Sequence, residues 1–168
     1  MKTNKITFLG IMLSLSLILS YVDSLIPLST YVPGMKIGLA NIITMYVLFN
    51  YRVRDAFIIM LLRVLISGLL FSGINSIIFG LTGGVLCIIF MTVSKKTRLF
   101  SVIGVSVIGS LSHNLGQVLA AFIIMDNINV MYYFPFLLIT GLFTGAVIGY
   151  ISGILIRRFE KIWSDNTK

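Results

Sequence analysis

Charged residues are scarce in this sequence. They make up 11% of its 168 residues, whereas 58% are hydrophobic; a soluble domain has about 25% charged and about 45–50% apolar residues. So few charges cannot cover a surface that faces water. The composition therefore excludes an ordinary soluble enzyme and predicts an integral membrane protein with a single domain, residues 1–168.

Acidic residues, cysteine and histidine are scarcer still. The chain has five acids, one cysteine and one histidine, which excludes a disulfide framework or a cysteine metal cluster. No two acids are placed to hold magnesium diphosphate together, and the phosphate-binding loop Gly-x-x-x-x-Gly-Lys-Ser/Thr is absent. We therefore expect no metal, no cofactor and no enzymatic activity. If a substrate moves against its gradient, another subunit must supply the energy.

Long apolar runs between the few charges indicate the membrane spans, because roughly 20 apolar residues cross the hydrocarbon core. The longest uncharged run, Val64 to Ser94, is divided by the polar cluster Ser72–Ser76, which predicts a turn. We therefore predict an all-α protein with six transmembrane helices, at residues 6–22, 35–51, 54–71, 77–94, 101–125 and 131–156.

The positions of the basic residues predict the orientation, since Lys and Arg of short loops stay on the cytoplasmic side. In the six-span arrangement, eleven bases fall on one face and the opposite connections hold Asp23, Asp126 and Lys36. Both termini are therefore predicted to be cytoplasmic. This topology explains the net charge of +8, so that the lipid bilayer is the expected partner and nucleic acid is not. The eleven are Lys2, Lys5, Arg52, Arg54, Lys95, Lys96, Arg98, Arg157, Arg158, Lys161 and Lys168.

Span five carries a stripe of polar side chains at helical spacing, with the chain's one histidine near mid-span. Imidazole and carboxamide groups offer both donors and acceptors to a small polar ligand. The same groups could instead form a hydrogen-bond ladder to a neighbouring helix, and both interpretations stay open. The stripe consists of Ser106, Ser110, His113, Asn114 and Gln117.

The outer ends of spans two and four form a second candidate region. Pro33–Gly34 predicts a turn that starts span two, with Lys36 in its first turn and Asn41 one turn further on. The positive end of the helix and the Lys36 ammonium could hold an anionic group, or Lys36 could be an interfacial lysine. Asn75 and Ser76 are expected to cap span four beside the same mouth.

Arg63 is a third candidate, because it lies deep in span three, where an unpaired charge is expensive. The acids that could pair with it lie near the span ends. A ligand anion, helix carbonyls or the polar stripe could therefore be its partner, and a structural role is as consistent with the sequence as ligand binding.

Three motifs resemble those of the Gx transporter family, often labelled heptaprenyl diphosphate synthase component I. They are Pro33-Gly-Met-Lys-Ile-Gly-Leu-Ala-Asn41, Arg63-Val-Leu-Ile-Ser-Gly-Leu-Leu-Phe71 followed by Gly80-Leu-Thr-Gly-Gly84, and Ser112-His-Asn-Leu-Gly-Gln117. The family is similar to the substrate-binding S components of energy-coupling factor (ECF) transporters. The resemblance implies a six-helix bundle in the bacterial cytoplasmic membrane that binds one small molecule near its outer face.

The resemblance also implies partners, namely a transmembrane coupling subunit and two ATPases. S components often contact the coupling subunit through small residues on span one, and the nearest equivalents here are Gly10-x-x-x-Ser14 and Ser16-x-x-x-Ser20. The leading hypothesis is a substrate-capture subunit of an ATP-driven importer for an anionic or carbonyl-bearing molecule. The alternative is a non-catalytic membrane partner of a prenyl diphosphate synthase.

Overall fold

The computed structural model describes residues 2–26 and 37–165, with side chains for residues 5–26 and 37–159. These residues form helices and no strand, which confirms the predicted all-α class. In chain order the elements are α1 (Lys2–Leu25), α2 (Asn41–Asn50), α3 (Val53–Ser67), the π-helical turn η2 (Gly68–Ser72), α4 (Ile74–Thr97), α5 (Val102–Met125), the 3₁₀ turn η3 (Ile128–Tyr133) and α6 (Phe134–Asp165).

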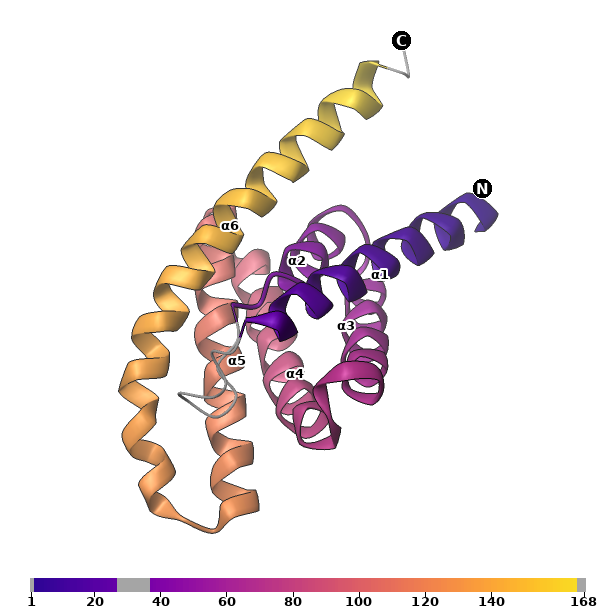
Figure 1. The fold of residues 1–168 in the computed structure, drawn as a ribbon. Helices are drawn as coiled ribbons and strands as arrows, with labels where there is room; N and C mark the ends of the chain where they lie inside the picture. The colour runs from indigo at the N-terminus through magenta and orange to yellow at the C-terminus, as the bar shows by residue number, and fades with distance from the viewer. Residues whose placement is uncertain (1, 27–36, 166–168) are drawn as a thin grey trace.

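The helices form one bundle in which α5 packs between α4 and α6, while α1 packs against α2 and α3. Figure 1 shows α5 and α6 as a long hairpin, with the last part of α6 projecting beyond the bundle. The start of α1 and the end of α6 lie at the same end of the molecule (Figure 1). The two ends of the described chain therefore lie on one side of the bundle.

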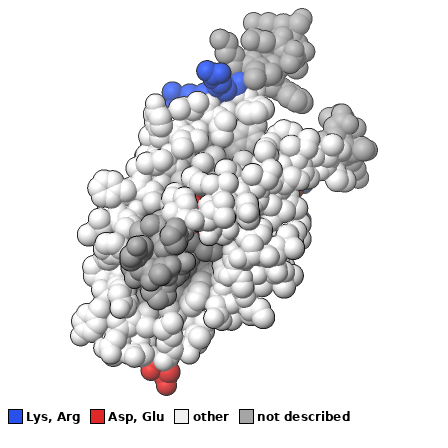
Figure 2. Space-filling view, viewed as in Figure 1, with Lys and Arg blue, Asp and Glu red and all other residues white. Residues whose placement is uncertain are grey.

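The outer surface of the bundle is apolar. Large hydrophobic side chains such as Leu69, Ile123 and Phe143 are more than 70% exposed, and Figure 2 shows an almost uncharged surface with basic groups at one end and acidic groups at the other. Soluble proteins rarely expose apolar patches larger than a few hundred Å². This surface fits a protein whose sides face lipid.

Five of the described helices are long and apolar enough to cross a membrane, and α2 is shorter. Its ten residues span about 15 Å at about 1.5 Å per residue, about half of the hydrocarbon thickness. Seven consecutive residues of α2, Ile42 to Leu48, are buried, so this helix lies inside the bundle. The prediction of six full spans is unconfirmed, because α2 begins at Asn41 and is too short to cross the membrane alone, while residues 35 and 36 of the predicted second span lie outside the described residues.

Three contacts bring the basic ends of the helices together. Lys5 of α1 forms an ion pair with Asp55 of α3 at 2.7 Å. At the end of α4, Lys95 Nζ donates to the Leu48 carbonyl of α2 at 2.7 Å. The Tyr46 ring of α2 meets the Phe159 ring of α6 edge to face. Consecutive long helices therefore run in alternating directions, and their basic ends share one end of the bundle.

The glycines of the Gly80–Gly84 motif, which lies on α4, allow this helix to pack closely on two sides. A Cβ atom at Gly80 or Gly84 would lie 2.8 Å from Val64 or 2.6 Å from Met60, both on α3. A Cβ atom at Gly83 would instead lie 2.8 Å from the backbone oxygen of His113 on α5. The motif therefore lets α4 approach α3 and α5 at the same level.

The turn between α3 and α4 is tighter than the sequence indicates. The predicted turn covered Ser72–Ser76, but the structure has the π-helical turn η2 followed by a break at Gly73. Gly73 has φ +81°, a conformation that glycine adopts readily. Helix α4 therefore starts at Ile74, before its predicted start at Ile77.

Candidate functional site

A cavity of about 300 Å³ lies toward the end of the bundle opposite the basic end. Helices α1 to α5 contribute to it, together with η2 and the turn before α2. Most of its lining residues are polar, which is unusual for the inside of a membrane bundle. The polar lining residues are Ser20, Asp23, Ser24, Asn41, Arg63, Ser67, Ser72, Ser76, His113 and Gln117.

Arg63 of α3 is the fixed cation in the described lining of the cavity. Its side chain is 9% exposed, and Nη2 donates to Asn41 Oδ1 at 3.2 Å. Its Nε has no hydrogen-bond partner among the described residues. A buried donor without a partner is expensive, so Arg63 has capacity to bind an acceptor in the cavity.

The turn before α2 positions the Asn41 carboxamide beside Arg63. Gly38 has φ +81°, and its carbonyl accepts the Asn41 backbone amide at 2.8 Å. A Cβ atom at Gly38 would lie 3.1 Å from Asn41 Nδ2. Glycine at this position therefore permits both the turn and the orientation of Asn41.

Asp23, which the sequence assigns to a connection on the face opposite the bases, lines the cavity. It is 7% exposed, and its charge interacts with that of Arg63. The sequence held a signal for this placement, because Ser16, Ser20 and Asp23 follow one another at steps of four and three. That spacing puts them on one face of α1, and all three are buried.

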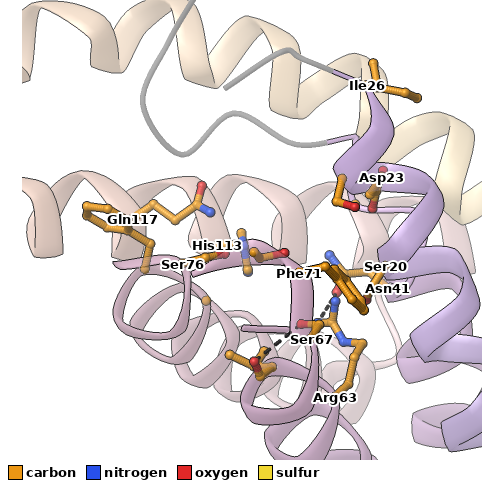
Figure 3. A pocket seen from close by; sticks show the side chains of 16 residues that line it. Ser20, Asp23, Ile26, Asn41, Arg63, Ser67, Phe71, Ser76, His113 and Gln117 are labelled. Atoms are coloured by element: carbon orange, nitrogen blue, oxygen red, sulfur yellow. Dashed lines mark hydrogen bonds between the residues drawn. The ribbon is translucent and has the colours of Figure 1, made fainter. Parts of the chain in front are cut away.

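The polar stripe of span five, which is α5 in the structure, has two different environments: some of its side chains line the cavity and others contact α6. His113 and Gln117 line the cavity (Figure 3), whereas Asn114 Nδ2 donates to the Leu137 carbonyl of α6 at 2.6 Å. Ser110 also contacts α6, with its Oγ 3.3 Å from Thr144 Oγ1. Consecutive helical residues point about 100° apart, so His113 and Asn114 face different partners.

Two phenylalanines supply the aromatic part of the cavity wall. Phe71 of η2 and Phe79 of α4 both line it. The Phe71 ring lies edge to face against Tyr21 of α1, with the ring centroids 5.5 Å apart. Their positions within apolar runs do not distinguish these two rings from the other phenylalanines of the chain.

The other predicted residues have different outcomes. Lys36 lies outside the described residues, and Asn75 is exposed and does not line the cavity. Gly73, and not Asn75 or Ser76, occupies the N-cap position of α4. Gly10 and Ser14 lie on the exposed face of α1, away from the cavity.

Substitutions at Asn114 and Gln117 should separate packing from ligand contact. We expect Asn114→Ala to lower the free energy of unfolding by about 0.5–1.5 kcal/mol, since the Leu137 carbonyl loses this hydrogen bond and keeps the one from Thr140 Oγ1. Gln117→Ala should leave stability nearly unchanged and weaken ligand binding about tenfold. Thermal melts and ligand titrations of the two variants in detergent measure both effects. An affinity loss confined to Asn114→Ala would contradict this division of the stripe.

Among the described residues, no three His, Cys, Asp or Glu side chains are grouped so that they could hold a metal ion.

Residues 12–155 match the family described as heptaprenyl diphosphate synthase component I. No curated protein and no solved structure matches the chain. The matched region includes every described residue that lines the cavity.

Proposed function

The chain belongs to the heptaprenyl diphosphate synthase component I family, and from this premise we propose that it captures a small polar molecule as the S component of an ECF-type importer. The observation that carries the proposal is the cavity with the buried guanidinium of Arg63 in its wall. A bilayer protein bears the cost of a buried charge where the charge has a function.

The size of the cavity also supports capture of a small molecule. A volume of about 300 Å³ equals that of about ten water molecules at about 30 Å³ each. Such a cavity suits a compact ligand with an anionic or carbonyl group that can accept hydrogen bonds from Arg63.

We propose a location in the bacterial cytoplasmic membrane, with both termini cytoplasmic and six spans in which α2 completes the second. The cavity then opens toward the outside, because it lies opposite the basic end of the bundle. In a Cys87→Ser background, an impermeant maleimide added outside should label a cysteine at Asn127 but not one at Lys96. Both positions are exposed in the structure. Labelling of Lys96 from outside in intact cells would overturn this orientation.

We propose that the coupling subunit contacts the exposed face of α1. A Cβ atom at Gly10 would meet nothing within 4 Å, and Ser14 on the next turn is exposed. The other small pair, Ser16 and Ser20, is buried in the bundle. Small residues at an exposed i, i+4 spacing allow another helix to approach closely.

Leucine at Gly10 or Ser14 should therefore block assembly. We expect co-purification with a coupling subunit and its ATPases to fall about tenfold or more, while ligand binding is retained. Gly153→Leu on α6 is the matched control, since its Cβ position has one neighbour, at 3.9 Å. If Gly10→Leu assembled normally, the contact would have to lie on another face. The same co-purification tests the proposed function, because failure of the unaltered protein to bind either an importer module or a ligand would contradict it.

A second candidate function is a non-catalytic membrane partner of a prenyl diphosphate synthase, and the family description favours it. Such a partner would hold the soluble enzyme at the bilayer through the basic end of the bundle. In this case a prenyl synthase would co-purify with the chain, and removal of the cavity charges would not change that association. In either function we propose that the chain has no catalytic activity of its own.

A further inference from the structure

We infer that the cavity binds a zwitterion with an aromatic ring, an aromatic α-amino acid by class, whose carboxylate meets Arg63 and whose ammonium group meets Asp23. The inference rests on the proposed capture function and specifies its substrate. It assigns a binding role to Asp23, a residue that we had placed in a connection outside the membrane.

The donor side of the site is formed by Arg63 and Asn41. The single hydrogen bond from Nη2 to Asn41 Oδ1 leaves Nε, which is buried and has no partner among the described residues. A guanidinium group binds a carboxylate through parallel N–H donors. A ligand carboxylate would therefore satisfy the donor that the described protein groups leave unpaired.

The acceptor side is formed by α1. Asp23 and Ser20 are three residues apart and so share a face of the helix, and both are buried residues that line the cavity. Ser20 Oγ has no hydrogen-bond partner among the described residues. A carboxylate and a hydroxyl group are suitable acceptors for an ammonium group, which has three donors and no acceptor.

Charge balance favours a zwitterion over a simple anion. Asp23 and Arg63 interact electrostatically and together contribute no net charge to the described lining. A buried charge is tolerated when it is paired and hydrogen-bonded. An anion would compensate Arg63 and at the same time be repelled by Asp23, whereas a zwitterion places an opposite charge beside each and keeps the site neutral.

The rest of the cavity suits a flat, mostly apolar group. Figure 3 shows Asp23, Asn41 and Arg63 toward the α1 side of the cavity, with His113 and Gln117 toward α5. Asp23 and Arg63 line the same cavity and interact electrostatically, as recognition of the adjacent ammonium and carboxylate groups of an α-amino acid requires. Phe71 and Phe79 line the same cavity and can pack against a ring.

The test uses the purified full-length protein in detergent and titrates it with L-phenylalanine, L-tyrosine and L-tryptophan. At least one should bind, and two analogues of that amino acid, one without the amino group and one without the carboxylate, should each bind about 10- to 100-fold more weakly. If none of the three bound at millimolar concentration, the inference would be overturned. Equal binding of the analogue without the amino group would overturn it as well.

The Asp23→Asn variant shows whether Asp23 recognises the ligand or has only a structural role. The preference of the unaltered protein for the amino acid over its deaminated analogue should fall to less than about threefold in this variant. Asp126→Asn, an exposed acid that does not line the cavity, is the matched control and should keep the full preference. If Asp23→Asn lowered the melting temperature and kept the preference, Asp23 would have a structural role and the inference would be wrong.

A further measurement distinguishes this inference from the proposed function. Mass spectrometry of the small molecules released from the purified protein should find an aromatic amino acid. A bound molecule that lacks an amino group would overturn the inference and leave the capture function in place. Co-purification with a prenyl synthase, together with the absence of any bound small molecule, would overturn both.

Discussion

Arg63→Gln should reduce the ligand that co-purifies with the protein about a hundredfold, the largest effect on binding that we expect from any single substitution. The variant loses charge-assisted hydrogen bonds, each worth about 1.5–3 kcal/mol, and about 1.4 kcal/mol corresponds to a factor of ten in affinity. It also leaves the buried Asp23 carboxylate without its neighbouring cation. Quantitative mass spectrometry of the extracted ligand, normalised to protein, measures the loss.

Two further variants show whether the loss reflects recognition or misfolding. Arg158→Gln makes the same change at an exposed position of α6 and should retain the ligand. The double variant Arg63→Gln/Asp23→Asn removes both buried charges, so that neither is left without the opposite charge. It should melt close to the unaltered protein and still fail to bind. A double variant that regained the ligand would show that Arg63 does not contact it.

Gly116→Ala should be among the most destabilising single-methyl substitutions in the bundle. A Cβ atom at this position of α5 would lie 2.7 Å from the Thr82 carbonyl oxygen and 2.8 Å from Gly83 Cα. Both are backbone atoms of α4, so the helices themselves must move apart. Overpacking of this kind costs about 1–3 kcal/mol, and the displaced α5 carries His113 and Gln117 away from the cavity. Thermal melts and ligand titrations should both show a loss.

The control variant, Gly153→Ala, should change the melting temperature in the opposite direction. At Gly153 of α6 a Cβ atom would have one neighbour, a Val102 methyl group at 3.9 Å. Alanine in a helix is favoured over glycine by about 0.5–1 kcal/mol, so Gly153→Ala should raise the melting temperature slightly. Equal melting temperatures for Gly116→Ala and Gly153→Ala would show that α4 and α5 are not held at this crossing.

Arg63 could be identified from the sequence as a candidate site residue because a charge inside the membrane is energetically expensive. A permanent cation in the middle of a long apolar run must have a partner, and this holds before the partner is known. The sequence could not show which partner this is, because Asp23 and Asn41 are 40 and 22 residues away along the chain. Asp23 also ends an apolar run, so its position in the sequence predicts a connection outside the membrane.

Periodicity predicted the polar stripe on span five but could not show which of its side chains face the cavity and which face α6. His113 and Asn114 both fall within one polar face, and the positions of α4 and α6 decide that His113 meets the cavity while Asn114 binds the Leu137 carbonyl. The number of membrane spans could not be settled from the sequence for the same reason. A run of apolar residues around α2 predicts burial, but whether lipid or other helices surround it depends on the packing.

The sequence by itself determined that this chain is an α-helical membrane protein with its bases at one end and a buried arginine, because composition, charge spacing and desolvation cost act locally along the chain. The tertiary structure decided where the polar groups meet. Helix packing placed Asp23 beside Arg63 and turned Asn114 toward α6, and it left the face of Gly10 and Ser14 exposed. Those outcomes depend on which helices are neighbours, and residues distant in sequence become neighbours when the bundle packs.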